Sequence, residues 1–301
     1  MLDRKIAMIG CTDAGWYTIK ALLKSGICFN YFICISHNDV ARYKISGYKD
    51  FTDLAHEYGI PIYYVKSYSL KNEEDILFFN EHQFDLVVQG GWQRLFPDEV
   101  LKTLSIGAIG IHGSSDYLPK GRGRSPLNWS LIEGKSRFIM HLFLIKPGID
   151  DGDVFDCEMF DINLLDTIKT LYYKNSIVTT RMLIRSIPKL LNGDVSFMPQ
   201  TGIPSYYSKR EPEDGLINWE EMDVYHIYNF VRAQTKPYPG AFGYIEDKCY
   251  KIWECKIFDT RITYPDNKYG DCVEKFDHDL IINCRGGLLL IYEYELVSYM
   301  S

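Results

Sequence analysis

The sequence lacks a framework of paired cysteines. Its eight cysteines are scattered over 301 residues, and none belongs to a Cys-x-x-Cys pair. This pattern excludes the usual zinc-finger spacings, and unpaired thiols are typical of proteins in a reducing compartment. We therefore predict a cytoplasmic protein that holds no structural metal.

Basic charge is also scarce. Lysine and arginine number 33 against 40 aspartates and glutamates, which gives a formal net charge of −7. Surfaces that bind nucleic acid need clustered cations, so this balance disfavours an obligate nucleic-acid partner, although a local basic patch remains compatible with it. No apolar run is long enough for a transmembrane helix or has the pattern of a signal peptide, and we expect no membrane partner.

A dinucleotide-binding fingerprint is missing from the first turn. The residues there are Gly10-Cys11-Thr12-Asp13-Ala14-Gly15 rather than G-x-G-x-x-G. The glycine spacing that lets a backbone approach a pyrophosphate is absent, which disfavours NAD.

Apolar runs and helical patterns alternate through the first two thirds of the chain. This alternation predicts an α/β, Rossmann-like domain with a mostly parallel sheet, whose ligands bind beyond the carboxyl ends of the strands. The expected strands are residues 5–9, 30–36, 62–65, 84–88, 106–111, 137–145 and 152–160. Helices are expected after Thr12 and Pro97 and over residues 51–58, 72–82 and 166–191. The core-facing stripe predicted for the last helix is Thr167, Leu171, Ile177, Leu183 and Leu190.

The composition shifts at Ile203 toward proline, tyrosine, serine and charged residues. A helix over 220–235 precedes five short strand-like segments, at 242–245, 250–258, 272–275, 280–283 and 288–296. This spacing predicts a small all-β, OB-like domain. The predicted domains are thus residues 1–203 and 204–301, and the tyrosine-rich tail is a candidate homodimer surface.

One histidine and one aspartate stand out. His112 follows an apolar strand and precedes Gly113 and Ser114, so an imidazole there can reach a substrate and transfer protons near neutral pH. Asp150 lies in the turn GIDDGD, where a carboxylate can orient that imidazole. A lone histidine is more often structural, and a glycine-flanked aspartate is equally compatible with a solvent turn.

Two loops could bind ligands. Lys120, Arg122 and Arg124 alternate with glycines, an arrangement that suits phosphate or carboxylate groups but also an ordinary basic surface loop. The turn Gln89-Gly90-Gly91-Trp92 follows a buried strand and could cradle a flat heterocycle or be merely a turn.

Several of these segments, in order, resemble the formyltransferases that use N10-formyltetrahydrofolate. The segments IGIHGSS, LPKGRGRSPLNW and PGIDDGD match the family pattern N-x-H-G-S-L-L-P-x-x-R-G-x-x-P followed by G-x-D-x-G. AHEYGIPIY, DTIKTLYYK, REPEDGLINW and RAQTKPYPGAF are similar to further family segments. The resemblance covers most of the chain, and domain size and order resemble methionyl-tRNA formyltransferase and the sugar N-formyltransferases.

The resemblance implies roles for particular residues. His112 and Asp150 match the catalytic histidine and aspartate of the family, whereas the family asparagine falls on Gly110. Two residues are also inserted between Ser114 and Pro119. Folate binding is expected from Gln89, Gly90, Gly91, Trp92 and Asp150, and substrate binding from Ser114, Lys120, Arg122, Gly123 and Arg124.

The resemblance further implies direct transfer without a metal. An amine attacks the formyl carbon of N10-formyltetrahydrofolate, His112 stabilises the oxyanion or handles the amine proton, and Asp150 assists. The missing carboxamide would have helped to hold that oxyanion. Either the inserted loop or a side chain such as Ser114 or Asn128 replaces it, or activity is weak or lost.

The acidic composition favours a nucleotide-linked amino sugar over transfer RNA as the acceptor. We therefore predict an N-formyltransferase of surface-glycan biosynthesis, such as that of lipopolysaccharide or O-antigen. Two alternatives stay open: a methionyl-tRNA formyltransferase, and a catalytically impaired relative that only binds nucleotide sugar or folate.

Overall fold

The computed structural model describes residues 4–43, 45 and 47–297. They form two compact units. The first contains the chain up to Arg122, Ile139–Met159 and Asn175–Ser205, and the second contains Gly123–Phe138, Phe160–Lys174 and the chain from Tyr206 onward. The domain boundary predicted after residue 203 stays a prediction.

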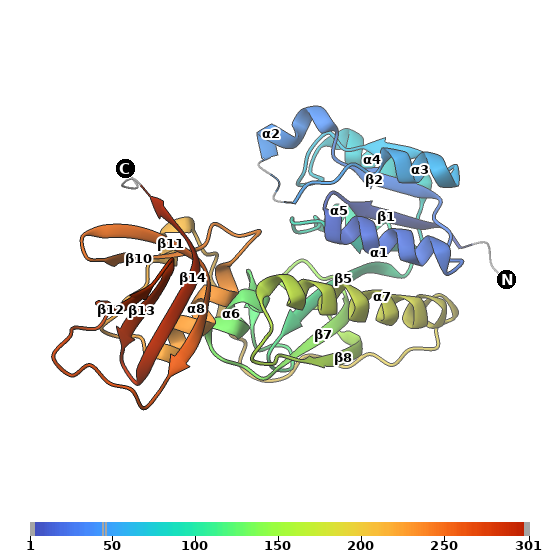
Figure 1. Ribbon diagram of the computed structural model, residues 1–301. Coiled ribbons are helices and arrows are strands. Elements are labelled where there is room, and N and C mark those ends of the chain that lie inside the picture. Colours follow the sequence, from blue (N-terminus) through green and yellow to red (C-terminus); the bar gives the residue numbers. More distant parts are fainter. Residues whose placement is uncertain (1–3, 44, 46, 298–301) are drawn as a thin grey trace. The chain divides into compact units, whose positions relative to one another are not determined.

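A seven-stranded sheet has the order β3-β2-β1-β4-β5-β7-β8 (Figure 1). Strands β3, β2, β1, β4 and β5 pair in parallel, and β7 runs antiparallel to β5. The predicted mostly parallel sheet is thereby confirmed. The strands are β1 (Ile6–Gly10), β2 (Tyr31–Cys34), β3 (Ile62–Tyr64), β4 (Leu86–Gly90), β5 (Gly107–Ser114), β7 (Arg137–Leu144) and β8 (Val154–Asp161).

Helices join the strands, and their starts follow capping rules. Thr12 caps the helix that lies along β1 and β4, and Asn72 caps the one that follows β3. A short 3₁₀ turn at His37–Asp39 and helix α2 follow β2, and neither is among the elements expected from the sequence. The helices are α1 (Asp13–Lys24), α2 (Val40–Tyr43), α3 (Thr52–Tyr58), α4 (Glu73–His82), α5 (Asp98–Leu101) and α7 (Ile168–Asn192).

Two strands extend further than the sequence predicts. β4 includes Gln89 and Gly90, which pair with Ile9 and Gly10 rather than forming a turn. β5 continues to Ser114 because its last residues pair with β7. His112 therefore lies within the carboxyl end of a strand, and glycine and serine there did not end it.

Two residues of the stripe predicted for α7 differ from the prediction: Thr167 precedes the first residue of the helix, and Ile177 does not face the core. Ile177 is 63% exposed, whereas Leu171, Leu183 and Leu190 are buried as expected. Six positions separate Leu171 from Ile177, which turns the latter about 240° around the helix axis. Val178 and Met182 occupy the buried face instead.

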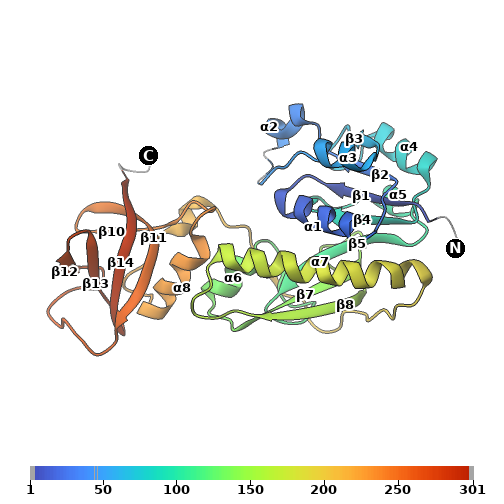
Figure 2. The same ribbon diagram turned by 45° about the vertical axis from the view of Figure 1, so that its right-hand side comes forward.

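The second unit contains a five-stranded antiparallel sheet of order β10-β11-β14-β13-β12 (Figure 2). Helix α8 packs on β11 and on α6. Helix α6 is not among the helices expected from the sequence. The predicted all-β region is confirmed. The elements are α6 (Pro126–Ile132), α8 (Val224–Gln234), β10 (Ala241–Ile245), β11 (Lys248–Asp259), β12 (Cys272–Phe276), β13 (Asp279–Cys284) and β14 (Gly287–Val297).

The described residues contain neither a membrane-spanning helix nor a cluster of metal-ligating side chains. Over residues 4–43, 45 and 47–297, none of the helices has both the length and the apolar character needed to cross a membrane. In the same residues, no three or more His, Cys, Asp or Glu side chains gather so as to hold a metal ion.

Candidate active site

The predicted histidine lies on one face of the β5–β7 ladder. Side chains alternate along a strand, so Gly110, His112 and Ser114 share this face. Directly opposite residues of antiparallel strands also share a face, and His112 pairs with His141 while Gly110 pairs with Phe143. Both histidines are buried, with 8% and 1% exposure. The strand register therefore brings two imidazoles together.

The structure brings His112 and Asp150 together as predicted. Nδ1 of the imidazole lies 3.4 Å from Oδ2 of the carboxylate. Nε2 lies 2.8 Å from the backbone oxygen of Gly121 and donates a hydrogen bond to it, because a carbonyl only accepts. The side chain of Asp150 is 23% exposed against 8% for His112, so the carboxylate is the more accessible member of the pair.

His141 is a third ionisable group in this region. Burial, followed by the neighbouring charge of His112, lowers its pKa to about 4, although the His112 backbone opposes this. Its Nε2 accepts a hydrogen bond from the backbone N–H of Leu118 at 3.5 Å. The imidazole is therefore neutral at physiological pH. An isolated polar residue in the apolar strand FIMHLFL was the signal that sequence reasoning overlooked.

The place of the family asparagine is filled. A Cβ added to Gly110 would lie 2.4 Å from Cε2 of Phe143, whose ring is 3% exposed. Of the two proposed replacements, Ser114 is buried and its Oγ accepts from the Asp116 N–H at 3.4 Å. Asn128 belongs to the second unit, where its amide donates to the Ala233 oxygen at 2.8 Å.

The glycines of the Gln89–Trp92 segment have a packing reason. A Cβ on Gly91, whose φ is +82°, would lie 1.8 Å from Oγ1 of Thr12. The carbonyl of Gly90 would be equally close to a Cβ on Gly15. Trp92 is buried edge-on against Tyr68, with ring centroids 4.7 Å apart. The turn after β4 thus packs tightly on the turn after β1.

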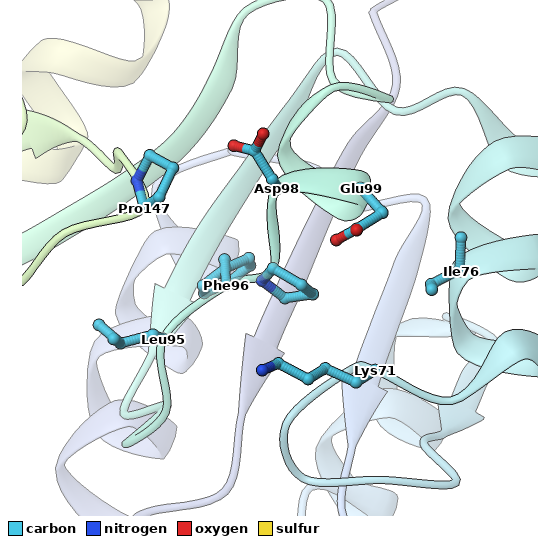
Figure 3. Close-up of a pocket in the computed structure, with 8 residues that line it drawn as sticks. Lys71, Ile76, Leu95, Phe96, Asp98, Glu99 and Pro147 are labelled. Atoms are coloured by element: carbon cyan, nitrogen blue, oxygen red, sulfur yellow. The ribbon is translucent and has the colours of Figure 1, made fainter.

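A cavity of about 410 Å³ is lined in part by residues 95–99, which follow the Gln89–Trp92 turn in the sequence (Figure 3). Leu95 and Pro147 lie on one side of it and Ile76 on the other, and the side chain of Lys71 extends across it near Phe96. Pro147 precedes the GIDDGD turn, but none of the residues predicted to bind folate is among the lining residues of the cavity. Its lining residues are Lys71, Ile76, Leu95, Phe96, Pro97, Asp98, Glu99 and Pro147.

The cations of the predicted substrate loop differ from one another. Lys120 and Arg124 are exposed. Arg122 instead donates from Nε and Nη2 to Oε1 of Gln200, at 3.1 and 2.6 Å. Gly123, in the second unit, has φ +100°, and a Cβ there would lie 2.5 Å from the Tyr207 oxygen. The loop is thus held by contacts that the sequence did not reveal.

Comparisons with known proteins agree with the motifs. A family profile described as formyl transferase matches residues 4–187, and one described as formyl transferase, C-terminal domain, matches residues 209–298. The chain is 31% identical over 282 residues to the bifunctional polymyxin resistance protein ArnA of Wigglesworthia glossinidia brevipalpis. That alignment covers 93% of this chain but only 41% of the relative, so the chain spans less than half of the relative's length.

Solved structures share the fold. An N-formyltransferase from Helicobacter canadensis, in complex with folinic acid and dTDP-3-aminofucose, matches with TM-score 0.69 at 18% identity, over 97% of this chain and all of that one. WlaRD, a sugar 3N-formyltransferase solved with dTDP and 5-N-formyl-THF, matches with TM-score 0.66 at 20% identity, over 99% of each chain. Methionyl-tRNA formyltransferase from Clostridium thermocellum matches with TM-score 0.62 at 16% identity, over 98% of this chain and all of that one.

Proposed function

The chain belongs to the formyl transferase family, and we propose that it transfers a formyl group to the primary amine of a nucleotide-linked amino-deoxysugar. The observation that carries the catalytic part is the His112–Asp150 pair at the carboxyl end of β5. In open α/β sheets this is the edge at which ligands bind.

We propose N10-formyltetrahydrofolate as the formyl donor, since two of the solved relatives were crystallised with formyl folates. The cavity beside Pro147 fits such a molecule chemically. Leu95 and Phe96 offer apolar contacts to a ring system, Glu99 offers acceptors for ring N–H groups, and Lys71 offers a cation for a carboxylate. The folate supplies the formyl group to the reaction.

The geometry supports a division of work within the catalytic pair. Asp150 is the more exposed partner, so we assign to its carboxylate the removal of the amine proton. Nδ1 of His112 lies 3.4 Å from that carboxylate, and the imidazole is itself fixed by the Gly121 carbonyl through Nε2. This assignment exchanges the roles that the family resemblance implied, in which His112 faces the substrate.

Three observations support a nucleotide sugar as the acceptor. One solved relative was crystallised with a dTDP-linked amino sugar and another, a sugar 3N-formyltransferase, with dTDP. Lys120, in the first unit, is an exposed cation that can bind a phosphate group. The net charge of −7 disfavours transfer RNA. A cytoplasmic place in surface-glycan biosynthesis follows as part of the same proposal.

A second candidate function has its own observation. Phe143 fills the space of the family asparagine, which favours a relative that binds nucleotide sugar or folate without rapid transfer. The two candidates differ in turnover, because only the first releases tetrahydrofolate.

The decisive experiment incubates the purified protein with N10-formyltetrahydrofolate and dTDP-, UDP-, GDP- or CMP-linked amino sugars, and follows tetrahydrofolate release. The matched control for each substrate is its N-acetylated form, which lacks a free amine. We expect release with one amino sugar and none with its acetylated form. Release with methionyl-tRNA alone would overturn the sugar assignment, and binding without release would favour the second candidate.

A further inference from the structure

The segment from Met198 to Ser205 runs between the two loops that hold the catalytic pair. At its start, Met198 and Val154 exchange backbone hydrogen bonds of 2.7 and 2.9 Å. This pairing fixes the segment beside the first residue of β8, directly after the GIDDGD turn. The side chains that follow Met198 therefore lie beside the GIDDGD turn.

Gln200 holds the turn that carries Asp150. Its Nε2 donates to the backbone oxygens of Asp150 and Gly152, each at 2.8 Å. Asp150 has φ +49°, a left-handed conformation that residues other than glycine seldom adopt. The opposite end of the same amide, Oε1, accepts both bonds from Arg122. One side chain thus ties the Asp150 turn to the loop that follows β5.

Ser205 holds the residue against which His112 rests. Its Oγ accepts from the N–H of Gly121 at 2.9 Å, and its backbone oxygen accepts from the N–H of Arg122 at 3.0 Å. Its own N–H donates to the Pro119 oxygen at 3.2 Å. Gly121 is the residue whose carbonyl accepts from His112 Nε2. Displacing Ser205 therefore removes support from the imidazole.

We propose that Gln200 and Ser205 are positioning residues for the reaction: Gln200 sets Asp150, Ser205 sets His112 through Gly121, and the segment between them fixes the two relative to each other. The proposal rests on the proposed function, because it assumes that the pair acts on an acceptor amine. Errors of about 1 Å in such a pair can cost about 100-fold in rate, so supports outside the site affect turnover.

The first test compares Gln200→Ala, Gln200→Glu and Thr201→Ala in formyl transfer. Gln200→Glu keeps an oxygen for Arg122 but loses the N–H donors to the two carbonyls. We expect both Gln200 variants to lower kcat roughly 10- to 100-fold with KM changed less than twofold. Thr201 is an exposed neighbour, and its variant should match wild type. A raised KM with wild-type kcat in Gln200→Glu would overturn the positioning role.

The second test examines the other end of the segment. Ser205→Ala should lower kcat about 10-fold, and Ser205→Thr, which keeps the hydroxyl, should restore most of it. Because each side chain supports one member of the same pair, the double variant Gln200→Ala/Ser205→Ala should lose less than the product of the two single effects. Equal losses in the Ala and Thr variants would contradict the role of the hydroxyl.

Hydrogen–deuterium exchange tests the proposal without turnover. Gln200→Ala should speed exchange in residues 148–153, and Ser205→Ala in residues 119–122, while Thr201→Ala should change neither. If exchange is unchanged in both variants, the proposal that Gln200 and Ser205 hold these two segments is overturned. If the wild type transfers formyl to no amine, the proposed function fails, whereas the exchange result still decides whether the segment holds the two loops.

Discussion

Two aspartates, Asp150 in the first unit and Asp166 in the second, show how similar side chains are held differently. The carboxylate of Asp166 accepts from the Asn163 N–H and the Thr170 hydroxyl, at 2.8 and 2.9 Å, and pairs with Lys174. Burial opposes ionisation there, but these contacts hold its pKa below the usual value. These three partners of its carboxylate lie within eight residues, whereas its backbone oxygen accepts from Arg232, 66 residues away, at 2.7 Å.

The carboxylate of Asp150 is placed differently. Its backbone oxygen also accepts from a distant side chain, that of Gln200, fifty residues away, but its carboxylate lies 3.4 Å from His112, which belongs to β5. The comparison teaches that a carboxylate satisfied by its own turn stabilises that turn. A carboxylate that faces a side chain from another element is suited to the proton transfer that we propose for Asp150.

The largest effect should come from Asp150→Asn. Loss of the carboxylate removes the proposed proton acceptor, and kcat for formyl transfer should fall about 10²- to 10⁴-fold. Urea unfolding should change little, because Asn keeps the side-chain volume and the backbone contacts. Steady-state kinetics and urea titration measure both effects. A wild-type kcat in Asp150→Asn would show that the Asp150 carboxylate, like that of Asp166, is not needed for transfer.

The next effect is the pH dependence of the unfolding free energy that His141 causes, the histidine that pairs with His112 across the β5–β7 ladder. The pKa of His141 is lowered to about 4, below an unfolded value near 6.5, so the unfolded chain binds more protons between these values. Stability should therefore fall by on the order of 3 kcal/mol as pH drops from 6.5 to 4, and urea titrations at several pH values measure it.

The matched variants for this measurement are His141→Gln and His56→Gln. Glutamine does not ionise, so His141→Gln should reduce the fall in unfolding free energy between pH 6.5 and 4. His56 is exposed, and His56→Gln should leave this fall unchanged. Identical slopes for wild type and His141→Gln would show that another group causes the decline.

A third prediction concerns the glycine beside the catalytic face. Gly110→Asn should cost about 1–3 kcal/mol of stability, because the new Cβ meets the ring of Phe143. Adding Phe143→Leu should recover part of this loss and raise kcat above that of Phe143→Leu alone, since the carboxamide then has room. Thermal unfolding and formyl-transfer kinetics measure the two effects. An inactive, stable double variant would refute the role of the carboxamide.

The smallest effect should come from Asp166→Asn. Asn keeps an acceptor for the local N–H groups but loses the charge that faces Lys174, so unfolding free energy should drop by about 1 kcal/mol while kcat stays at the wild-type value. Since the folded pKa of Asp166 is lowered, its contribution is present above the unfolded pKa of about 3.9 and is lost as pH falls through the folded pKa.

This acid dependence separates the two regions. The His141 decline should occur above pH 4 and the Asp166 decline below it, so urea titrations across pH 2–7 resolve them. A kcat reduced in Asp166→Asn without loss of stability would contradict its structural role.

Most of the fold could be predicted from the sequence, because short apolar runs bounded by turn residues mark its strands. The strands around Ile9, Phe32 and Val88 are apolar runs bounded by turns, and the parallel sheet and the five C-terminal strands are confirmed. Local patterns failed where distant pairing decides. Gly113 and Ser114 have the composition of a loop, yet pairing with β7 keeps them in a strand.

For the site, the motif order predicted that His112 and Asp150 belong together, and the family resemblance is confirmed. The folate and substrate roles of the remaining residues stay predictions. Gln200 and Ser205 could not be found from the sequence, because their contacts reach backbone atoms 48 to 84 positions away. No local pattern marks a side chain that binds a distant carbonyl.

The pairing of β5 with β7 determines where this chain can change length. Removing or adding one residue within β7 would turn His141 and Phe143 to the opposite face of the sheet, and the face on which we propose that catalysis occurs would be lost. The two residues inserted relative to the family lie after Ser114, where β5 has ended. An insertion directly after Ser114 therefore leaves the ladder register unchanged, provided that Leu118 and Gly121 keep their hydrogen bonds to His141 and His112.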